Sequence, residues 1–170
     1  MAKRLAAASD DIQVVHLDDF YRPSADRYVG APSKRPIAAD FDLDRRRAEL
    51  LVPLRSGAAS RYYLYNWEAD QVSAQAVAVA KPIVIVEGIY SLTIGLSGLF
   101  DLAIWVECPR DVRLARGLAR DGEAARSRWE NDWMVGEDQY MARERPRDRA
   151  NLVCDGNRDS SRDVLILHER

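Results

Sequence analysis

Two apolar, β-branched runs that each end in a carboxylate constrain the fold of this chain more than any other feature. The first run is Val14–Leu17, followed by Asp18 and Asp19, and the second is Pro82–Val86, followed by Glu87. Such runs are typical of strands that are buried on both faces, as in a parallel sheet covered by helices. Ligands bind at the carboxyl ends of such strands. Carboxylates that converge there would suit a divalent cation and a proton acceptor.

Asp18 and Asp19 allow two interpretations. If the strand continues through them, alternation directs the two side chains to opposite faces, so they cannot do the same work. Alternatively, both are turn residues that close a strand. The second acidic strand end, at Glu87, favours a functional role.

Length and composition indicate a single soluble domain. The chain has 170 residues, of which 47% are hydrophobic and 31% charged, enough for a sizeable core. A net charge of −2 provides no overall field to attract nucleic acid or an anionic membrane. No apolar stretch approaches the roughly 20 residues that span a bilayer, and Met1–Ser9 lacks the apolar core of a signal peptide. We therefore expect a cytoplasmic protein with no membrane or nucleic-acid partner.

Cys108 and Cys154 lie in or beside strand-like runs. Buried free thiols are the simpler interpretation in such positions. We expect no disulfide.

Periodicity and turn residues predict an alternation of strands and helices along the rest of the chain. A long loop is expected over residues 22–41. Loops of that length often serve as lids or binding segments. Residues 68–81 show little periodicity and are expected to form an irregular connector. The other expected elements are helices over 2–9, 45–54, 110–120 and 123–143, strands over 101–108 and 150–156, and a short edge strand over 164–167.

The segments Asp18-Asp19-Phe20-Tyr21 and Glu87-Gly88-Ile89-Tyr90 together resemble the uridine kinase and phosphoribulokinase group of P-loop kinases. The resemblance extends to about Gly156. It implies an α/β fold, a three-layer P-loop kinase-like domain with a parallel sheet, spanning 1–170 with a lid region at about 113–128. It also implies transfer of a phosphoryl group from ATP, with Mg²⁺, to a hydroxyl of a small metabolite such as uridine or cytidine.

The phosphate-binding loop of this group, G-x-x-x-x-G-K-[ST], has no copy in these 170 residues, and the strand that leads into it is also missing. That loop supplies the backbone cradle, the lysine and the Mg²⁺-binding hydroxyl. One explanation is that the true product begins further upstream, which the intact downstream motifs favour. The other is that the chain has lost ATP chemistry and is a binding or regulatory protein on a kinase scaffold.

The resemblance also suggests roles for the acidic and aromatic residues. Asp18 would accept the proton of the acceptor hydroxyl, and Glu87, together with Asp18, would hold Mg²⁺. Tyr21, Asp42 and Tyr65 would position the acceptor. Asp42 suits a helix N-cap equally well, and aromatic residues at a strand edge, such as Tyr65, are often ordinary packing.

Arginines follow the third strand. Arg113, Arg116 and Arg120 form one helical stripe, and such a stripe is usually a solvated face. In the resembled kinases, arginines of a mobile lid close over the moving phosphoryl group, because the guanidinium fork matches phosphate oxygens. Gly117 replaces one arginine of the family. By this resemblance the lid candidates are Arg120, Arg126 and Arg128, and the cofactor-binding candidates are Arg113, Arg116 and Gly156.

Several alternatives remain open from the sequence. A nucleic-acid-binding module built on residues 110–128 is disfavoured by the net charge and by the lack of interleaved aromatics. The acceptor could also be a nucleotide, a pantothenate-like compound or a sugar phosphate. A homo-oligomer is compatible with the sequence, because a sheet without its central strand exposes edges that a partner's strand could cover.

Overall fold

The computed structural model describes residues 2–157 and 167–169. The chain forms two compact units. Unit 1 comprises Met1–Val29 and Ala38–Phe100, and unit 2 comprises Gly30–Ile37 and Asp101–Arg170. Among the described residues, no helix has the length and apolar character needed to cross a bilayer.

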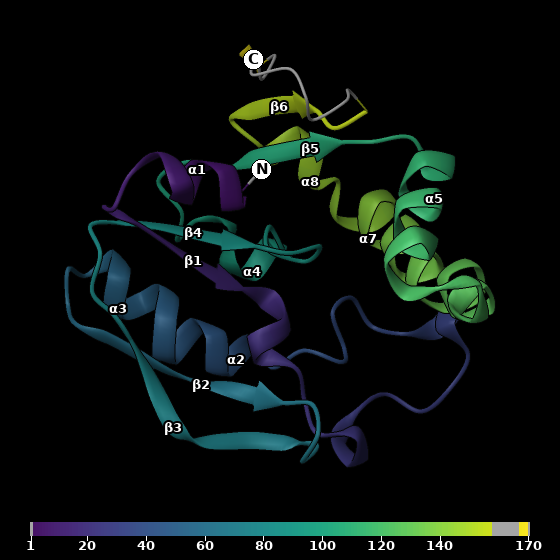
Figure 1. Ribbon diagram of the computed structural model, residues 1–170, viewed down its shortest axis with the longest axis horizontal. Coiled ribbons are helices and arrows are strands. Elements are labelled where there is room, and N and C mark those ends of the chain that lie inside the picture. The colour runs from purple at the N-terminus through teal and green to yellow at the C-terminus, as the bar shows by residue number, and fades with distance from the viewer. Residues whose placement is uncertain (1, 158–166, 170) are drawn as a thin grey trace. The chain divides into compact units, whose positions relative to one another are not determined.

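Both units combine helices with strands (Figure 1). The elements of unit 1 are α1 (Ala2–Ala8), β1 (Ile12–His16), α2 (Leu43–Arg46), α3 (Val52–Arg55), β2 (Ser60–Asn66), β3 (Gln71–Val79), β4 (Ile83–Glu87) and α4 (Ile94–Ser97). The elements of unit 2 are β5 (Ile104–Glu107), α5 (Arg110–Asp121), α6 (Arg126–Arg128), α7 (Met134–Glu144), α8 (Pro146–Arg149), β6 (Leu152–Asp155) and β7 (Leu167–Glu169).

Strands β1 and β4 pair in parallel, and they are the two runs that the sequence predicts to end in carboxylates. Their register places Val15 opposite Val86 and His16 opposite Glu87, and the two strands lie side by side in Figure 1. The prediction that both strands are buried on both faces is wrong, because Val15 is the one fully buried residue of the pair and Ile83 is exposed. Within the described residues each of the two strands has a single hydrogen-bonded neighbour. A ribbon of two strands is too narrow to shield all its side chains from water.

The chain leaves β1 in a 3₁₀ turn, Leu17–Phe20, instead of continuing as a strand. Leu17 and Phe20 are buried in this turn. Gly88 follows β4 with a φ of 144°, and a Cβ atom at this position would lie 2.4 Å from Leu17 Cβ. Glycine therefore allows the backbone after β4 to press against the turn that carries Asp18.

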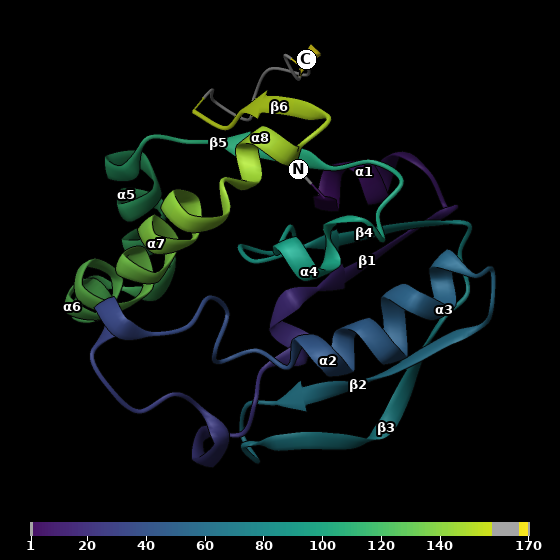
Figure 2. The same cartoon turned by 180° about the vertical axis from the view of Figure 1, so that it is seen from behind.

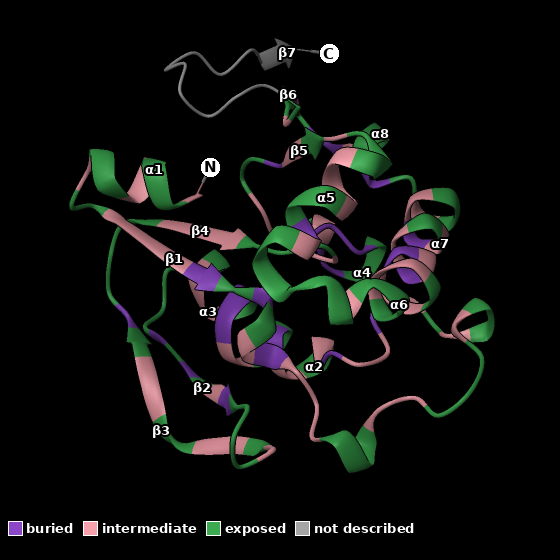
Figure 3. Ribbon diagram, turned by 45° about the vertical axis from the view of Figure 1, so that its right-hand side comes forward, coloured by how far each residue is buried: buried purple, intermediate pink, exposed green. Residues whose placement is uncertain are grey.

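The predicted helix over 45–54 is confirmed, with a distortion in its middle. A π-helical turn, Arg47–Leu51, joins α2 to α3 into one continuous helix. Figure 2 shows this helix beside β2, and Figure 3 shows that it carries much of the buried surface of unit 1. The core of the unit is formed by Val15, Phe20, Leu50, Leu51, Tyr62, Val79 and Leu96.

Strands β2 and β3 form an antiparallel hairpin, so the expected irregular connector over 68–81 is wrong. Ser60 pairs with Val79 at one end and Asn66 with Gln71 at the other. The Asn66 side chain accepts hydrogen bonds from the N–H groups of Glu68 and Ala69, both at 3.0 Å, which closes the turn in the way asparagine favours. Alanine, serine and glutamine in β3 dilute the alternation by which a strand is recognised.

In unit 2, β5 and β6 pair in parallel with Glu107 opposite Asp155, which confirms the strands predicted over 101–108 and 150–156 with narrower bounds. Strand β7 pairs antiparallel with β6. The edge strand predicted over 164–167 falls largely on residues 164–166, which lie outside the described residues. Both cysteines are free thiols, and Cys154 is buried whereas Cys108 is partly exposed.

The helices of unit 2 follow the prediction closely. Helix α5, Arg110–Asp121, ends one residue beyond the predicted range 110–120. Pro109 is its N-cap, and Gly122 follows its last residue. A π-helical turn, Trp129–Trp133, joins α6 to α7.

The long loop predicted over 22–41 is confirmed as largely irregular, and its middle part, 30–37, belongs to unit 2. There the Gln139 side chain donates a hydrogen bond of 2.8 Å to the carbonyl oxygen of Pro32. Arg35 and Asp132 form an ion pair of 2.7 Å. These contacts attach the segment to the α6–α7 helical region.

We expect Gly88→Ala to lower the free energy of unfolding by about 1–3 kcal/mol, because the new Cβ atom meets Leu17 and the backbone conformation disfavours a side chain. Gly95→Ala is the matched control: it lies in helix α4 with nothing within 4 Å of its would-be Cβ. Alanine there should be neutral or stabilising by up to about 1 kcal/mol. Urea unfolding measures both, and equal effects would contradict the close approach at Gly88.

Candidate active site

The carboxyl ends of β1 and β4 bring acidic groups to one edge of the strand pair. Glu87, the last residue of β4, lies opposite His16, and His16 Nδ1 forms a hydrogen bond with Glu87 Oε1. Asp18 follows two residues after His16 in the 3₁₀ turn, and it is exposed. The predicted proton acceptor and the predicted metal ligand are thus both at strand ends on the same edge.

Asp19 has different surroundings from Asp18. Its side chain is half-buried and accepts a hydrogen bond of 3.1 Å from the Tyr62 hydroxyl and one of 3.4 Å from the His16 N–H. Burial raises the pKa of the Asp19 carboxyl, and the hydrogen bond from Tyr62 opposes this. The two aspartates therefore differ, as strand alternation led us to expect, although a 3₁₀ turn and not a strand separates them.

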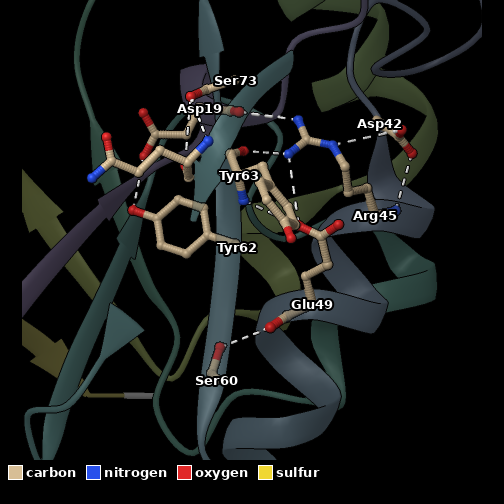
Figure 4. Close-up of polar contacts among 9 residues, drawn as sticks. Asp19, Asp42, Arg45, Glu49, Ser60, Tyr62, Tyr63 and Ser73 are labelled. Carbon is tan, nitrogen blue, oxygen red and sulfur yellow. Dashed lines mark hydrogen bonds and ion pairs between the residues drawn. The ribbon is translucent and has the colours of Figure 1, made fainter. Parts of the chain in front are cut away.

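Arg45, a residue of α2, holds the 3₁₀ turn Leu17–Phe20 in place (Figure 4). Its Nη2 atom donates a hydrogen bond of 3.0 Å to the carbonyl oxygen of Asp19, and its Nη1 atom donates to that of Tyr63. The guanidinium carbon also lies 4.8 Å from the centre of the Phe20 ring. Burial lowers the pKa of Arg45, and the nearby Glu49 carboxylate opposes this. Arg45 thus joins β2, α2 and the turn beside Asp18.

Asp42 is the N-cap of α2. Its Oδ1 atom accepts a hydrogen bond of 3.0 Å from the N–H of Arg45, and its own N–H donates one of 2.7 Å to the carbonyl oxygen of Phe20. Arg22 Nη2 lies 3.8 Å from Asp42 Oδ1. The capping interpretation of Asp42 is confirmed, and any contact with sugar hydroxyls remains a prediction.

The predicted acceptor-binding residues Tyr21 and Tyr65 meet in an aromatic cluster, with ring centres 6.0 Å apart. Trp67 lies 4.8 Å from each of the two rings, measured between centres. The guanidinium carbon of Arg27 lies over all three rings, at 4.9 Å from Tyr21, 5.3 Å from Tyr65 and 5.8 Å from Trp67. The sequence analysis did not identify Arg27.

Asp70 holds this aromatic cluster to the loop after Tyr21. It accepts hydrogen bonds from the Ser24 N–H at 2.9 Å, from the Ser24 hydroxyl and from the Tyr65 hydroxyl, and Arg27 Nη2 lies 3.6 Å away. These contacts, chiefly the one from the Ser24 side chain, lower the pKa of Asp70 to about 2. The sequence does not single out Asp70, because the turn before β3 lacks a clear hairpin pattern.

The predicted lid arginines, all in unit 2, have partners within their own segment. Arg120 donates two hydrogen bonds to Asp121, at 2.7 and 2.9 Å. Arg126 is paired with Glu123 and Glu130. The guanidinium of Arg128 lies 5.4 Å from the centre of a ring of Trp133. A phosphate ligand would have to replace these contacts.

The predicted cofactor-binding residues are divided between two places in unit 2. Arg116 Nη1 donates a hydrogen bond of 2.6 Å to the carbonyl oxygen of Gly156, so the structure brings these two together. Arg113 forms an ion pair of 3.0 Å with Glu137 on α7. Burial raises the pKa of Glu137, and Arg113 opposes this. Arg113 therefore holds two helices together.

Gly117 leaves room for the ring of Trp129. A Cβ atom at this position would lie 2.5 Å from the Trp129 ring system. Trp129 donates a hydrogen bond of 3.0 Å to Asp121, and its ring packs edge-on against Trp133 with centres 5.0 Å apart. Both tryptophans are half-buried.

Within the described residues, no group of three or more His, Cys, Asp or Glu side chains is placed to hold a metal ion. Mg²⁺ nevertheless needs only one or two protein carboxylates when phosphate oxygens and water complete its shell. Asp18 and Glu87 are hard oxygen donors at one edge of the strand pair, and this donor set fits Mg²⁺ bound together with a nucleotide.

Comparison with known proteins decides the family. The profile of the Phosphoribulokinase / Uridine kinase family matches residues 12–143. The chain belongs to this family. The matched range contains both acidic strand ends, the aromatic cluster and the arginine-rich helices.

Two curated relatives of this family member illustrate the relationship. A uridine kinase of Staphylococcus carnosus is 35% identical over 88 residues, which cover 51% of this chain and 41% of the relative. A uridine kinase of Shewanella baltica is 30% identical over 119 residues, which cover 66% of this chain and 55% of the relative. The chain thus spans about half the length of the curated relatives it matches.

A solved structure confirms the predicted fold class. A protein from Bacillus stearothermophilus, described as a possible uridine kinase, matches with a TM-score of 0.68 and 20% identity. The match covers 89% of this chain and 78% of that protein. At this identity the likeness shows the fold alone, which is the α/β kinase-like fold expected from the sequence.

We expect Tyr62→Phe to lower the free energy of unfolding by about 1–2 kcal/mol, because the half-buried Asp19 carboxylate loses its side-chain hydrogen-bond donor. Tyr63→Phe is the control, since its ring is 38% exposed and no hydrogen bond of its hydroxyl occurs in the described part of the chain. It should change the stability by less than about 0.5 kcal/mol. Urea unfolding tests both, and equal losses would rule out a stabilising role for the Tyr62–Asp19 contact.

The low pKa of Asp70 predicts a specific acid sensitivity. Its pKa falls from 3.8 to about 2 in the fold, so its contacts stabilise the fold above about pH 4 and lose this effect as the pH falls through 2. We expect Asp70→Asn to flatten the dependence of stability on pH between pH 4 and pH 2. Asp26→Asn, at an exposed position of the loop after Tyr21, should leave that dependence unchanged. Denaturant unfolding at several pH values gives the comparison.

Proposed function

We propose that the protein to which this chain belongs is an ATP-dependent phosphotransferase that acts on a hydroxyl of a small metabolite, most simply a nucleoside such as uridine or cytidine. The family match and the acidic edge of the β1–β4 pair support this proposal. The curated relatives it resembles are named uridine kinases. The observation that carries the proposal is the position of Asp18, exposed at the end of β1 beside the strand that ends in Glu87.

In this proposal Asp18 acts as the general base. Its carboxylate takes the proton of the acceptor hydroxyl, so that the hydroxyl oxygen forms a bond to the transferred phosphorus while the bond to the departing ADP breaks. An exposed carboxylate at a strand end is accessible to such a hydroxyl. Asp19 is poorly suited to this work because Tyr62 and the His16 N–H already occupy it.

Glu87, together with Asp18, would hold Mg²⁺ that is bound with the nucleotide. ATP with Mg²⁺ supplies the γ-phosphoryl group and neutralises charge as that group moves. The hydrogen bond from His16 restrains the orientation of the Glu87 carboxylate before any ligand arrives. A restrained ligand loses less conformational freedom on binding.

The aromatic cluster would hold the acceptor. Tyr21 follows Asp18 by three residues, at the end of the same 3₁₀ turn. Trp67 is 56% exposed and offers a ring surface for stacking. Tyr65 would support the other two rings of the cluster. Asp42 would reach a sugar hydroxyl only if its capping hydrogen bond from the Arg45 N–H loosened.

Arg120, Arg126 and Arg128 would stabilise charge on the moving phosphoryl group. Each of them now contacts an acidic or aromatic partner in its own segment. These contacts are exposed, and exposed ion pairs are weak. Replacement of such a carboxylate by a phosphate oxygen would therefore cost little free energy.

We expect Asp18→Asn to reduce turnover by at least about 10²-fold, because the amide cannot accept the proton. Thermal unfolding should stay nearly unchanged, since Asp18 is exposed. Asp26→Asn serves as the control and should retain full activity. The measurement is ADP release with uridine and cytidine as acceptors, and full activity of the Asp18 variant would exclude it as the base.

A further inference from the structure

Arg27 occupies the centre of the aromatic cluster. Its guanidinium carbon is within 6 Å of the ring centres of Tyr21, Tyr65 and Trp67. A cation over aromatic faces is attracted by their negative quadrupoles, and the Asp70 carboxylate at 3.6 Å adds an ion pair. The arrangement fixes the position of a charged group among side chains that would otherwise form an apolar surface.

The hydrogen-bond donors of Arg27 are only partly used. Its Nε atom donates a bond of 2.8 Å to the carbonyl oxygen of Arg22, and its Nη2 atom donates one of 2.6 Å to the Tyr65 hydroxyl. Nη1 makes no hydrogen bond within residues 2–157. A guanidinium carries five N–H donors and no acceptor, so Arg27 can offer further donors to a ligand and nothing else.

The acceptor groups around Arg27 are already committed. The Tyr65 hydroxyl donates its proton to Asp70 and accepts from Arg27. Asp70 receives three hydrogen bonds, two from Ser24 and one from Tyr65. A ligand that presents an N–H group to this place therefore finds the Tyr65 hydroxyl and most of the about four lone-pair sites of Asp70 in use. A ligand oxygen finds an available N–H donor on Arg27 Nη1.

We propose that Arg27 is a specificity-determining residue of the acceptor site, which selects a planar ring with a carbonyl oxygen over one with an amino group at the same place. This inference rests on the proposed function. The acceptor hydroxyl must face Asp18, so the edge of the ring remote from the sugar faces the cluster. Uracil carries a carbonyl oxygen at that edge, and cytosine carries an amino group.

The expected preference follows from the cost of an unmade hydrogen bond. A hydrogen bond from a charged donor corresponds to a factor of about 10 to 100 in affinity, and an amino group placed against a guanidinium forfeits it. We therefore expect kcat/KM for uridine to exceed that for cytidine by at least about tenfold in the full-length protein.

Arg27→Gln tests the role of the guanidinium. The glutamine amide both donates and accepts, so the uridine-to-cytidine ratio of kcat/KM should fall to within about threefold of unity. Arg27→Lys is a second variant that keeps the charge and remains a donor only, and it should retain most of the preference. Arg61→Gln, on an exposed position of β2, is the control and should leave the ratio unchanged.

The outcomes separate this inference from the proposed function. Turnover of nucleosides with an unchanged ratio in the Arg27→Gln variant overturns the role of Arg27 and leaves the kinase proposal in place. Equal kcat/KM values for the two nucleosides in the unmodified protein would also overturn the role of Arg27 and leave the kinase proposal in place. If the unmodified protein neither binds uridine or cytidine by calorimetry nor phosphorylates them, the proposed function fails and the inference fails with it.

Discussion

Parallel hydrogen bonding between β1 and β4 is the interaction on which the candidate site depends. The register that sets His16 opposite Glu87 also decides that the turn after β1 begins beside the end of β4. Gly88 then lets that turn approach without a side chain in between. A shift of one residue in this register would turn each side chain of one strand to the other face. The acidic edge would be lost although every residue remained in the sequence.

Within each unit, arginine side chains with different degrees of burial hold elements of the fold together. Arg45 is half-buried and binds main-chain oxygens of two elements, so it stabilises the turn whatever ligand is present. Arg27 is partly exposed, and it contacts aromatic rings as well as the Asp70 carboxylate. Some of its N–H donors remain available to a ligand. Arg120 of α5 and Arg126 of α6 are exposed and pair with carboxylates in their own segments. Burial thus separates an arginine that supports the main chain from arginines whose N–H groups remain accessible to solvent.

Much of this arrangement could be predicted from local sequence. The β-branched runs predict β1 and β4, and Asp42 marks the start of α2. Strand β3 could not be recognised because its alanines bury little surface and so leave a weak alternating pattern. Without β3, the hairpin turn could not be predicted. The hydrogen bond between Asp70 and Ser24, which lie 46 residues apart in the chain, could not be predicted either. The cap role of Asp42 and the separate roles of Asp18 and Asp19 lay within reach of the sequence. The contacts of Arg27 and Arg45 did not, because they depend on tertiary packing.

The loop after Tyr21 gives the molecule an unusual covalent plan. Because residues 30–37 belong to unit 2 while both flanks belong to unit 1, the chain passes between the units three times. Neither unit is therefore a continuous stretch of the gene. Recombination at one breakpoint cannot exchange either unit intact, and a protein cut at residue 100 would leave the Arg35 and Pro32 anchors on the wrong fragment. Because the two units alternate along the chain, a single recombination event cannot separate the arginine-rich helices from the acidic strand ends and keep both units whole.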